Sequence, residues 1–226
     1  MQYQEVAGGI CAPAGFAASG VHCGIRANRT KYDLALIKAD VRCAAAGVYT
    51  TNKVCGAPIK VDRAHLADGY AQAILVNSGN ANTCAANGVE LAEACCQLTG
   101  QALGIPAGDV LPASTGVIGQ PMTIDPFAAG IPAAAAKLAH TAQGSADAAT
   151  AIMTTDTCQK EYAIRFQLGG KSCTLGAIGK GSGMIAPNMA TMLAFYTTDA
   201  AVSPAMLQKA LRQVVPGTYN QMSVDL

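Results

Sequence analysis

Residues 180–193 read KGSGMIAPNMATML, and the rest of the chain can be interpreted outward from them. Lys180 stands alone in a glycine-rich loop, Pro187 and Asn188 follow, and an apolar run, TMLAFYTT, begins at Thr191. Glycine, proline and asparagine favour turns, whereas a short run rich in threonine and aromatic residues favours a strand. The segment therefore predicts a turn that places Ala190 and Thr191 at the edge of a strand.

A small residue followed by threonine at such a junction is suited to self-cleavage. The Thr191 hydroxyl can attack the Ala190 carbonyl and form an ester by an N-to-O acyl shift, and water then releases a new N-terminal threonine. The freed amine can serve as the base for its own hydroxyl, which activates the threonine as a nucleophile. An Ala-Thr pair between a loop and a strand is also common in chains that are never cleaved, so the residues alone leave both interpretations open.

Four other motifs stand upstream of this segment. They are GFAASGVHCGIR (15–26), VNSGNAN (76–82), PASTGVIG (112–119) and IMTTDT (152–157). In this order, and together with residues 180–193, they closely resemble the ornithine acetyltransferase family, the bifunctional glutamate N-acetyltransferases of the cyclic arginine pathway. The resemblance runs from about residue 5 to the last residue.

The resemblance implies acetyl transfer from N-acetylornithine to glutamate, by double displacement through an acetyl-threonine ester. It implies self-cleavage between Ala190 and Thr191, with Thr191 as the nucleophile and its new amine as the base. The family needs no metal or organic cofactor, and some members also accept acetyl-CoA. Complete members are heterotetramers of two α and two β chains, so the expected partners are small-molecule substrates and the cleaved chains themselves.

The resemblance assigns Thr115 and Gly116 as the oxyanion hole, and their residue types suit that role. A hydroxyl beside a glycine amide offers two donors with no side chain to block an approaching oxyanion. Without the resemblance, the pair would be interpreted as a turn that ends a strand. Thr154, Lys180 and Thr191 are assigned to substrate binding. A lysine beside a nucleophile can orient a carboxylate or stabilise developing negative charge.

The fold class implied is mixed α/β, with stacked β-sheets flanked by helices in an αββα-like layout that self-processing aminopeptidases share. The local pattern agrees, because buried strands alternate with alanine-rich helices. A turn is expected at 77–82, where the family has residues near its active centre. Strands are expected at 33–39, 41–50, 71–76, 110–114, 161–168, 172–178, 191–198 and 219–226, and helices at 82–103, 125–138, 146–153 and 204–215.

The chain departs from the family pattern near its last residue. Residues 1–190 correspond to the α chain, whereas the β chain is represented only by residues 191–226. The closing run NQMSVDL follows the family up to Asp225, and Leu226 then replaces an expected glycine. We therefore expect a truncated β chain that lacks the C-terminal substrate-binding residues. Sheet edges and apolar faces left uncovered predict aggregation.

The composition excludes several classes of function. A net charge of +1, from 15 basic and 14 acidic residues spread along the chain, predicts no nucleic-acid surface. No stretch approaches about 18 consecutive apolar residues, so no membrane helix is expected. The first residues, MQYQEVAGGICAPAGF, do not form the charged and apolar regions of a signal peptide. The sequence therefore predicts a cytoplasmic protein.

Nine cysteines and three histidines offer little sign of a metal or disulfide site. The cysteine count is odd and no C-x-x-C occurs, so most cysteines are expected to be small buried hydrophobic residues. His22 is expected to be structural, and neither His65 nor His140 lies in a motif of a histidine-activated nucleophile. No metal ligand is predicted.

Two other functions stay open on the sequence. One is a self-processing aminopeptidase or hydrolase that uses the same N-terminal nucleophile. The other is an inactive fragment that folds in part and catalyses nothing. The motif GSGMIAPNMATML favours the transferases over the aminopeptidase.

We predict that the expressed chain splits between Ala190 and Thr191, because the glycine-rich turn would strain that bond. Intact-mass measurement should find two pieces in the wild type and one uncut chain in Thr191→Ala. A single uncut chain in both proteins would contradict self-cleavage by this polypeptide.

Overall fold

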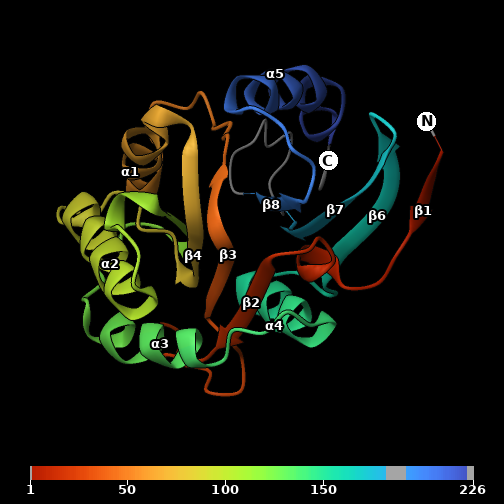
Figure 1. The fold of residues 1–226 in the computed structure, drawn as a ribbon. Coiled ribbons are helices and arrows are strands. Elements are labelled where there is room, and N and C mark those ends of the chain that lie inside the picture. The colour runs from red at the N-terminus through yellow and green to blue at the C-terminus, as the bar shows by residue number, and fades with distance from the viewer. Residues whose placement is uncertain (1, 182–191, 223–226) are drawn as a thin grey trace.

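The computed structural model describes residues 2–181 and 192–222, which form two four-stranded sheets with helices around them (Figure 1). One sheet has the order β1-β6-β7-β8 and the other β2-β3-β4-β5. The strands are β1 (Tyr3–Glu5), β2 (Phe16–Val21), β3 (Leu34–Ala44), β4 (Tyr70–Asn80), β5 (Val110–Val117), β6 (Lys160–Leu168), β7 (Lys171–Lys180) and β8 (Leu193–Thr198); the α-helices are α1 (Ala57–His65), α2 (Gly88–Leu103), α3 (Asp125–Ala136), α4 (Ala142–Ile152) and α5 (Pro204–Val214).

Two apolar cores hold these layers together. In the first, α1, α2 and α3 pack on one face of the β2–β5 sheet, around residues such as Leu36, Leu75 and Phe127. In the second, α4 packs with the opposite face and with the β1–β8 sheet, around Ile152 and Ile178. The mixed α/β class with stacked sheets and flanking helices is thus confirmed (Figure 1).

The strands expected at 33–39 and 41–50 are wrong as separate elements, because β3 covers most of the first range and continues into the second as far as Ala44. Its pairing with β4 shifts between Lys38 and Cys43, so a bulge keeps the chain in the same sheet. The strand ends at Ala44, and α1 follows after Gly56 without having been expected from the sequence. The proline in its first turn, Pro58, was the available signal.

The turn expected at 77–82 is also wrong at its start, because β4 continues to Asn80. Its polar side chains are buried and satisfied inside the fold. Asn77 Nδ2 donates to the Asn80 carbonyl at 2.8 Å, and Ser78 Oγ donates to the Ala151 carbonyl at 2.5 Å. The polar residues at the end of β4 therefore form a buried hydrogen-bond network and not a turn. Helix α2 begins at Gly88, later than expected.

The hairpin of β6 and β7 is confirmed, and Gly169 and Gly170 turn it with φ values of 58° and 77°. Helix α5 is confirmed too, with the Ser203 hydroxyl accepting from Met206 N. The strand expected at 219–226 is wrong over 219–222. That stretch holds a short 3₁₀ turn instead, in which Gln221 N donates to the Thr218 carbonyl at 2.9 Å and Met222 N donates to the Tyr219 carbonyl at 3.2 Å. Residues 223–226 lie outside the described part.

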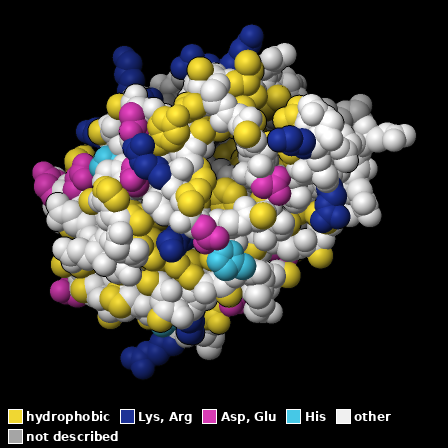
Figure 2. Space-filling model, in the orientation of Figure 1, with side chains coloured by type: hydrophobic (Ala, Val, Ile, Leu, Met, Phe, Trp, Pro, Cys, Tyr) yellow, Lys and Arg dark blue, Asp and Glu magenta, His cyan; other side chains and the backbone are white. Residues whose placement is uncertain are grey.

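The outer face of the β1–β8 sheet carries exposed aromatic side chains. Tyr162 and Tyr196 stand across β7 from each other, opposite Ala177 in the strand register, and are 49% and 42% exposed. Elsewhere, Figure 2 shows acidic and basic side chains interspersed over the visible face. In the described ranges, no helix is long and apolar enough to cross a bilayer.

We predict that Gly20→Ala destabilises the fold, because α4 approaches β2 too closely to admit a methyl group. A Cβ at Gly20 would lie 2.1 Å from the Asp147 carbonyl oxygen. Such overpacking costs about 1–3 kcal/mol. Gly108→Ala is the control, because nothing lies within 4 Å of a Cβ there. Denaturant unfolding should give a lower midpoint for Gly20→Ala than for Gly108→Ala. Equal midpoints would show that α4 moves away from β2 at little cost, and would contradict the prediction.

Candidate functional site

The structure places the described candidate residues in three segments. Thr115 and Gly116 lie near the end of β5, Thr154 lies in the loop after α4, and Lys180 is the last residue of β7. Ala190 and Thr191, the candidate cleavage bond and nucleophile, lie outside the described residues. Hydrogen bonds and close backbone contacts connect the three described segments.

At Gly116 the backbone of β5 lies close against the backbone of β4. The two strands are parallel, and Gly79 is the partner of Gly116 in the register. Gly116 has a φ of 134°, and a Cβ there would lie 2.3 Å from the Gly79 carbonyl carbon. Only glycine combines this conformation with this approach. Thr115, beside it, is 7% exposed.

Gly79 in turn makes room for Arg26. Its φ is 101°, and a Cβ on it would lie 2.8 Å from Arg26 Cγ. The Arg26 guanidinium donates from Nη2 to the Met153 carbonyl, immediately before Thr154. Burial lowers the pKa of Arg26, against the opposing field of Asp33. Arg26 thus connects the strand end that carries Gly79 to the loop that carries Thr154.

Asp33 fixes the turn that delivers Arg26. Its carboxylate is 0% exposed and accepts backbone N–H groups from Cys23 at 2.6 Å, Gly24 at 3.2 Å and Arg26 at 2.9 Å. His22 Nδ1 lies 3.2 Å from the same carboxylate. His22 therefore belongs to this turn. Sequence reasoning did not single out Asp33, because an aspartate before a strand has no distinctive pattern.

Lys180 is buried, with 5% exposure, and its Nζ donates to the Gly181 carbonyl at 2.7 Å. Burial lowers the pKa of Lys180, while the negative charge of Asp156 raises it and the positive charge of Lys160 lowers it again. A lysine among glycines is often solvated. This one lies in a low-dielectric environment, where its charge acts strongly on neighbouring groups.

Asp156 was missed by sequence reasoning, although it lies within the quoted IMTTDT motif. It accepts from Thr154 N at 3.1 Å and from Gly181 N at 2.7 Å, and it forms an ion pair with Lys160 at 2.7 Å. Burial raises the pKa of Asp156, but the hydrogen bonds from Lys160, Gly181 and Thr154 outweigh burial and hold that pKa below its usual value. Asp156 therefore joins Thr154 to the end of β7.

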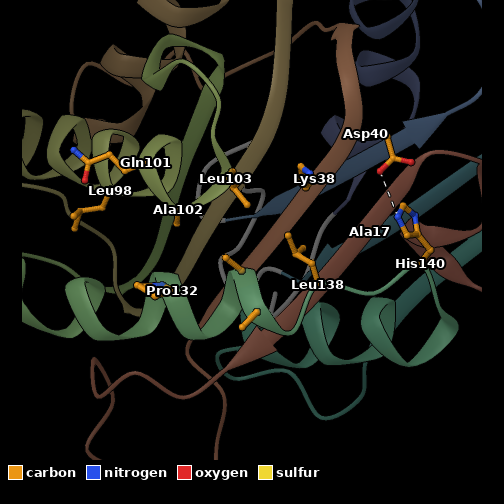
Figure 3. A pocket seen from close by; sticks show the side chains of 12 residues that line it. Ala17, Lys38, Asp40, Leu98, Gln101, Ala102, Leu103, Pro132, Leu138 and His140 are labelled. Carbon is orange, nitrogen blue, oxygen red and sulfur yellow. Dashed lines mark ion pairs between the residues drawn. The ribbon is translucent and has the colours of Figure 1, made fainter.

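The protein also contains a cavity of about 700 Å³ (Figure 3). The C-terminal ends of α2 and α3 and the strand face at Lys38 line it, and Asp40 and His140 form an ion pair of 3.3 Å at its edge. None of the described candidate residues lines this cavity. Within residues 2–181 and 192–222, no three His, Cys, Asp or Glu side chains gather as metal ligands would.

Stacked sheets, a glycine-lined pair of parallel strand ends and a buried lysine together define a mixed α/β chain with a small polar site. The model of the ArgJ family matches residues 17–226. The chain therefore belongs to the ArgJ family, which confirms the resemblance seen in its motifs.

Relatives and solved structures agree with this membership. The arginine biosynthesis bifunctional protein ArgJ of Symbiobacterium thermophilum is 51% identical over 97% of this chain and 55% of its own length. The crystal structure of the protein of that name from Bacillus halodurans has a TM-score of 0.79 at 37% identity, covering 84% of this chain and 98% of the other.

Ornithine acetyltransferase from Mycobacterium tuberculosis, solved in complex with ornithine, has a TM-score of 0.76 at 35% identity, covering 84% of this chain and all of the other. The chain spans about half the length of the curated relatives it matches. The chain therefore shares the family of these relatives, and its described residues share their fold.

We predict that Gly116→Ala destabilises the protein more than Gly119→Ala does. Both glycines have positive φ, 134° and 80°, so both variants should show backbone strain of about 1–3 kcal/mol. Only Gly116 adds a clash with Gly79, whereas nothing lies within 4 Å of a Cβ at Gly119. Urea unfolding measures both, and equal losses would show that β4 and β5 separate at little cost.

Proposed function

We propose that this chain carries the nucleophile and oxyanion hole of an acetyltransferase that moves acetyl from N-acetylornithine to glutamate in arginine biosynthesis. Membership in the ArgJ family supports the proposal, since relatives are named for arginine biosynthesis and a solved relative is an ornithine acetyltransferase bound to ornithine. The observation that carries it is that the Asp156 carboxylate accepts from both Thr154 N and Gly181 N. These bonds connect the Thr154 loop to the residue that follows Lys180.

The reaction proceeds in two displacements. After cleavage between Ala190 and Thr191, the Thr191 hydroxyl attacks the acetyl carbonyl of N-acetylornithine, and its own amine takes the proton. The C–N bond breaks, the proton passes to the leaving nitrogen, and ornithine departs. The amine of glutamate then attacks the acetyl-threonine ester, giving N-acetylglutamate and free Thr191.

Thr115 and Gly116 would stabilise the oxyanion of each tetrahedral intermediate. The Thr115 hydroxyl and the Gly116 N–H would be the two donors, and the close approach of Gly116 to Gly79 leaves no room for a side chain beside them. Losing one such donor typically lowers kcat by about 10²–10³. Thr154 and Lys180 would hold the substrate. Both substrates carry a carboxylate, and a buried ammonium is a suitable partner for it.

The remaining features follow from this function. Residues 1–190 would supply the oxyanion hole and residues 191–226 would begin the β chain, within a heterotetramer of two α and two β chains. Transfer needs no metal or organic cofactor, and acetyl-CoA would be an additional acetyl donor. The proposed location is the cytoplasm.

We expect the cleaved chain to form N-acetylglutamate when it receives N-acetylornithine and glutamate together. Thr191→Ala should form none, and Thr115→Ala should be about 10²–10³ slower. Mass spectrometry of the small molecules measures acetyl transfer and hydrolysis at once. If added glutamate leaves the rate of acetate release unchanged and forms no N-acetylglutamate, the result would support the hydrolase instead. No product from a folded, cleaved chain would contradict the proposed function.

A further inference from the structure

The loop between α4 and β6 carries a carboxylate, that of Asp156, which contacts the candidate residue Thr154 and the residue that follows Lys180. The Asp156 side chain is 2% exposed. Its Oδ2 accepts from Thr154 N at 3.1 Å, and its Oδ1 accepts from Gly181 N at 2.7 Å. Because Gly181 directly follows Lys180, a single carboxylate fixes the spacing between the loop and the end of β7.

Lys160 completes the environment of this carboxylate. Its Nζ donates to Asp156 Oδ1 at 2.7 Å and to the Cys158 carbonyl at 3.3 Å. Charge-assisted hydrogen bonds of this length are stronger than neutral ones and hold their partners in one geometry. Donors from three parts of the chain therefore fix the orientation of Asp156.

We propose that Asp156 is a positioning residue, which holds Thr154 and Lys180 at a fixed spacing so that the Lys180 ammonium faces the carboxylate of the amino-acid substrate. The inference rests on the acetyl-transfer function proposed above, since that function assigns Thr154 and Lys180 to the substrate. Asp156 acts through these two residues and not on the reacting atoms.

The charges around Lys180 provide a signature of this role. Among the described residues, Asp156 and Lys160 are the charged groups that act on Lys180, and they do so with opposite signs. Removing the charge of Asp156 should lower the pKa of Lys180 further, whereas removing the charge of Lys160 should raise it. A loop that had merely loosened would not give two shifts of opposite sign.

The test compares Asp156→Asn and Lys160→Gln with Asp199→Asn in the full chain. Asp199 is a matched control, because it also accepts a backbone N–H from β7, that of Thr174 at 2.6 Å. Thr174 lies about 20 Å from Lys180 along the strand, at the spacing of extended chain. NMR titration of the Lys180 ζ-nitrogen, assigned by its loss in Lys180→Arg, gives the pKa without requiring activity.

We expect the pKa of Lys180 to fall in Asp156→Asn, to rise in Lys160→Gln and to stay unchanged in Asp199→Asn. In an active wild type, Asp156→Asn should also lower kcat/KM for N-acetylornithine at least tenfold, mainly through KM. An unchanged Lys180 titration in Asp156→Asn, or an equal shift in Asp199→Asn, would overturn the proposal. If the wild type transfers no acetyl, the proposed function fails, while the titration still decides whether Asp156 positions Lys180.

Discussion

The geometry of the candidate site depends on one buried carboxylate, that of Asp33. An ionised carboxylate without partners would cost several kcal/mol to remove from water, and backbone N–H groups of residues 23–26 replace that water. The same bonds close the turn after β2 and tie it to the start of β3. Arg26 is placed by this turn between Gly79 and the loop after α4. A substitution at Asp33 would therefore displace the Thr154 loop through Arg26, although Asp33 does not contact Thr154 directly.

Small residues set the distances between the layers. Gly20 in β2 brings α4 close enough for a Cβ there to meet the helix backbone, and Gly144 in α4 approaches the Ala18 carbonyl in the same way. Ala148, Ala149 and Ala151 continue this close packing, each 0% exposed. Close contact leaves little room for adjustment, because protein interiors are packed as densely as organic crystals. The helix that leads into the Thr154 loop is therefore held rigidly against the sheet.

The sequence predicted the elements whose patterns are local and missed those that depend on distant partners. The β6–β7 hairpin and α5 were predictable, since paired glycines and a Ser-Pro start specify them within a few residues. The extension of β4 to Asn80 was not, because Asn77 and Ser78 are satisfied by Ser114 and Ala151, far away in the chain.

At the site, the motifs indicated Thr115, Gly116, Thr154 and Lys180, and their proposed roles still await test. Asp33 and Asp156 were not indicated, because a carboxylate that receives backbone N–H groups leaves no pattern in the residue types around it. The spacing at which Gly116 meets Gly79 also depends on how two strands align, which periodicity within one strand does not reveal.

The nine cysteines range from buried to exposed. Burial raises the pKa of Cys11 to about 11 and that of Cys95 to about 12, so these sulfurs stay protonated and unreactive. Cys84 and Cys158 are exposed. Cys158 lies two residues from Asp156, and Cys84 follows the asparagine-rich end of β4. A thiol-directed fluorophore would therefore attach preferentially at these two exposed cysteines, and a label on Cys158 would report on the loop that carries Asp156.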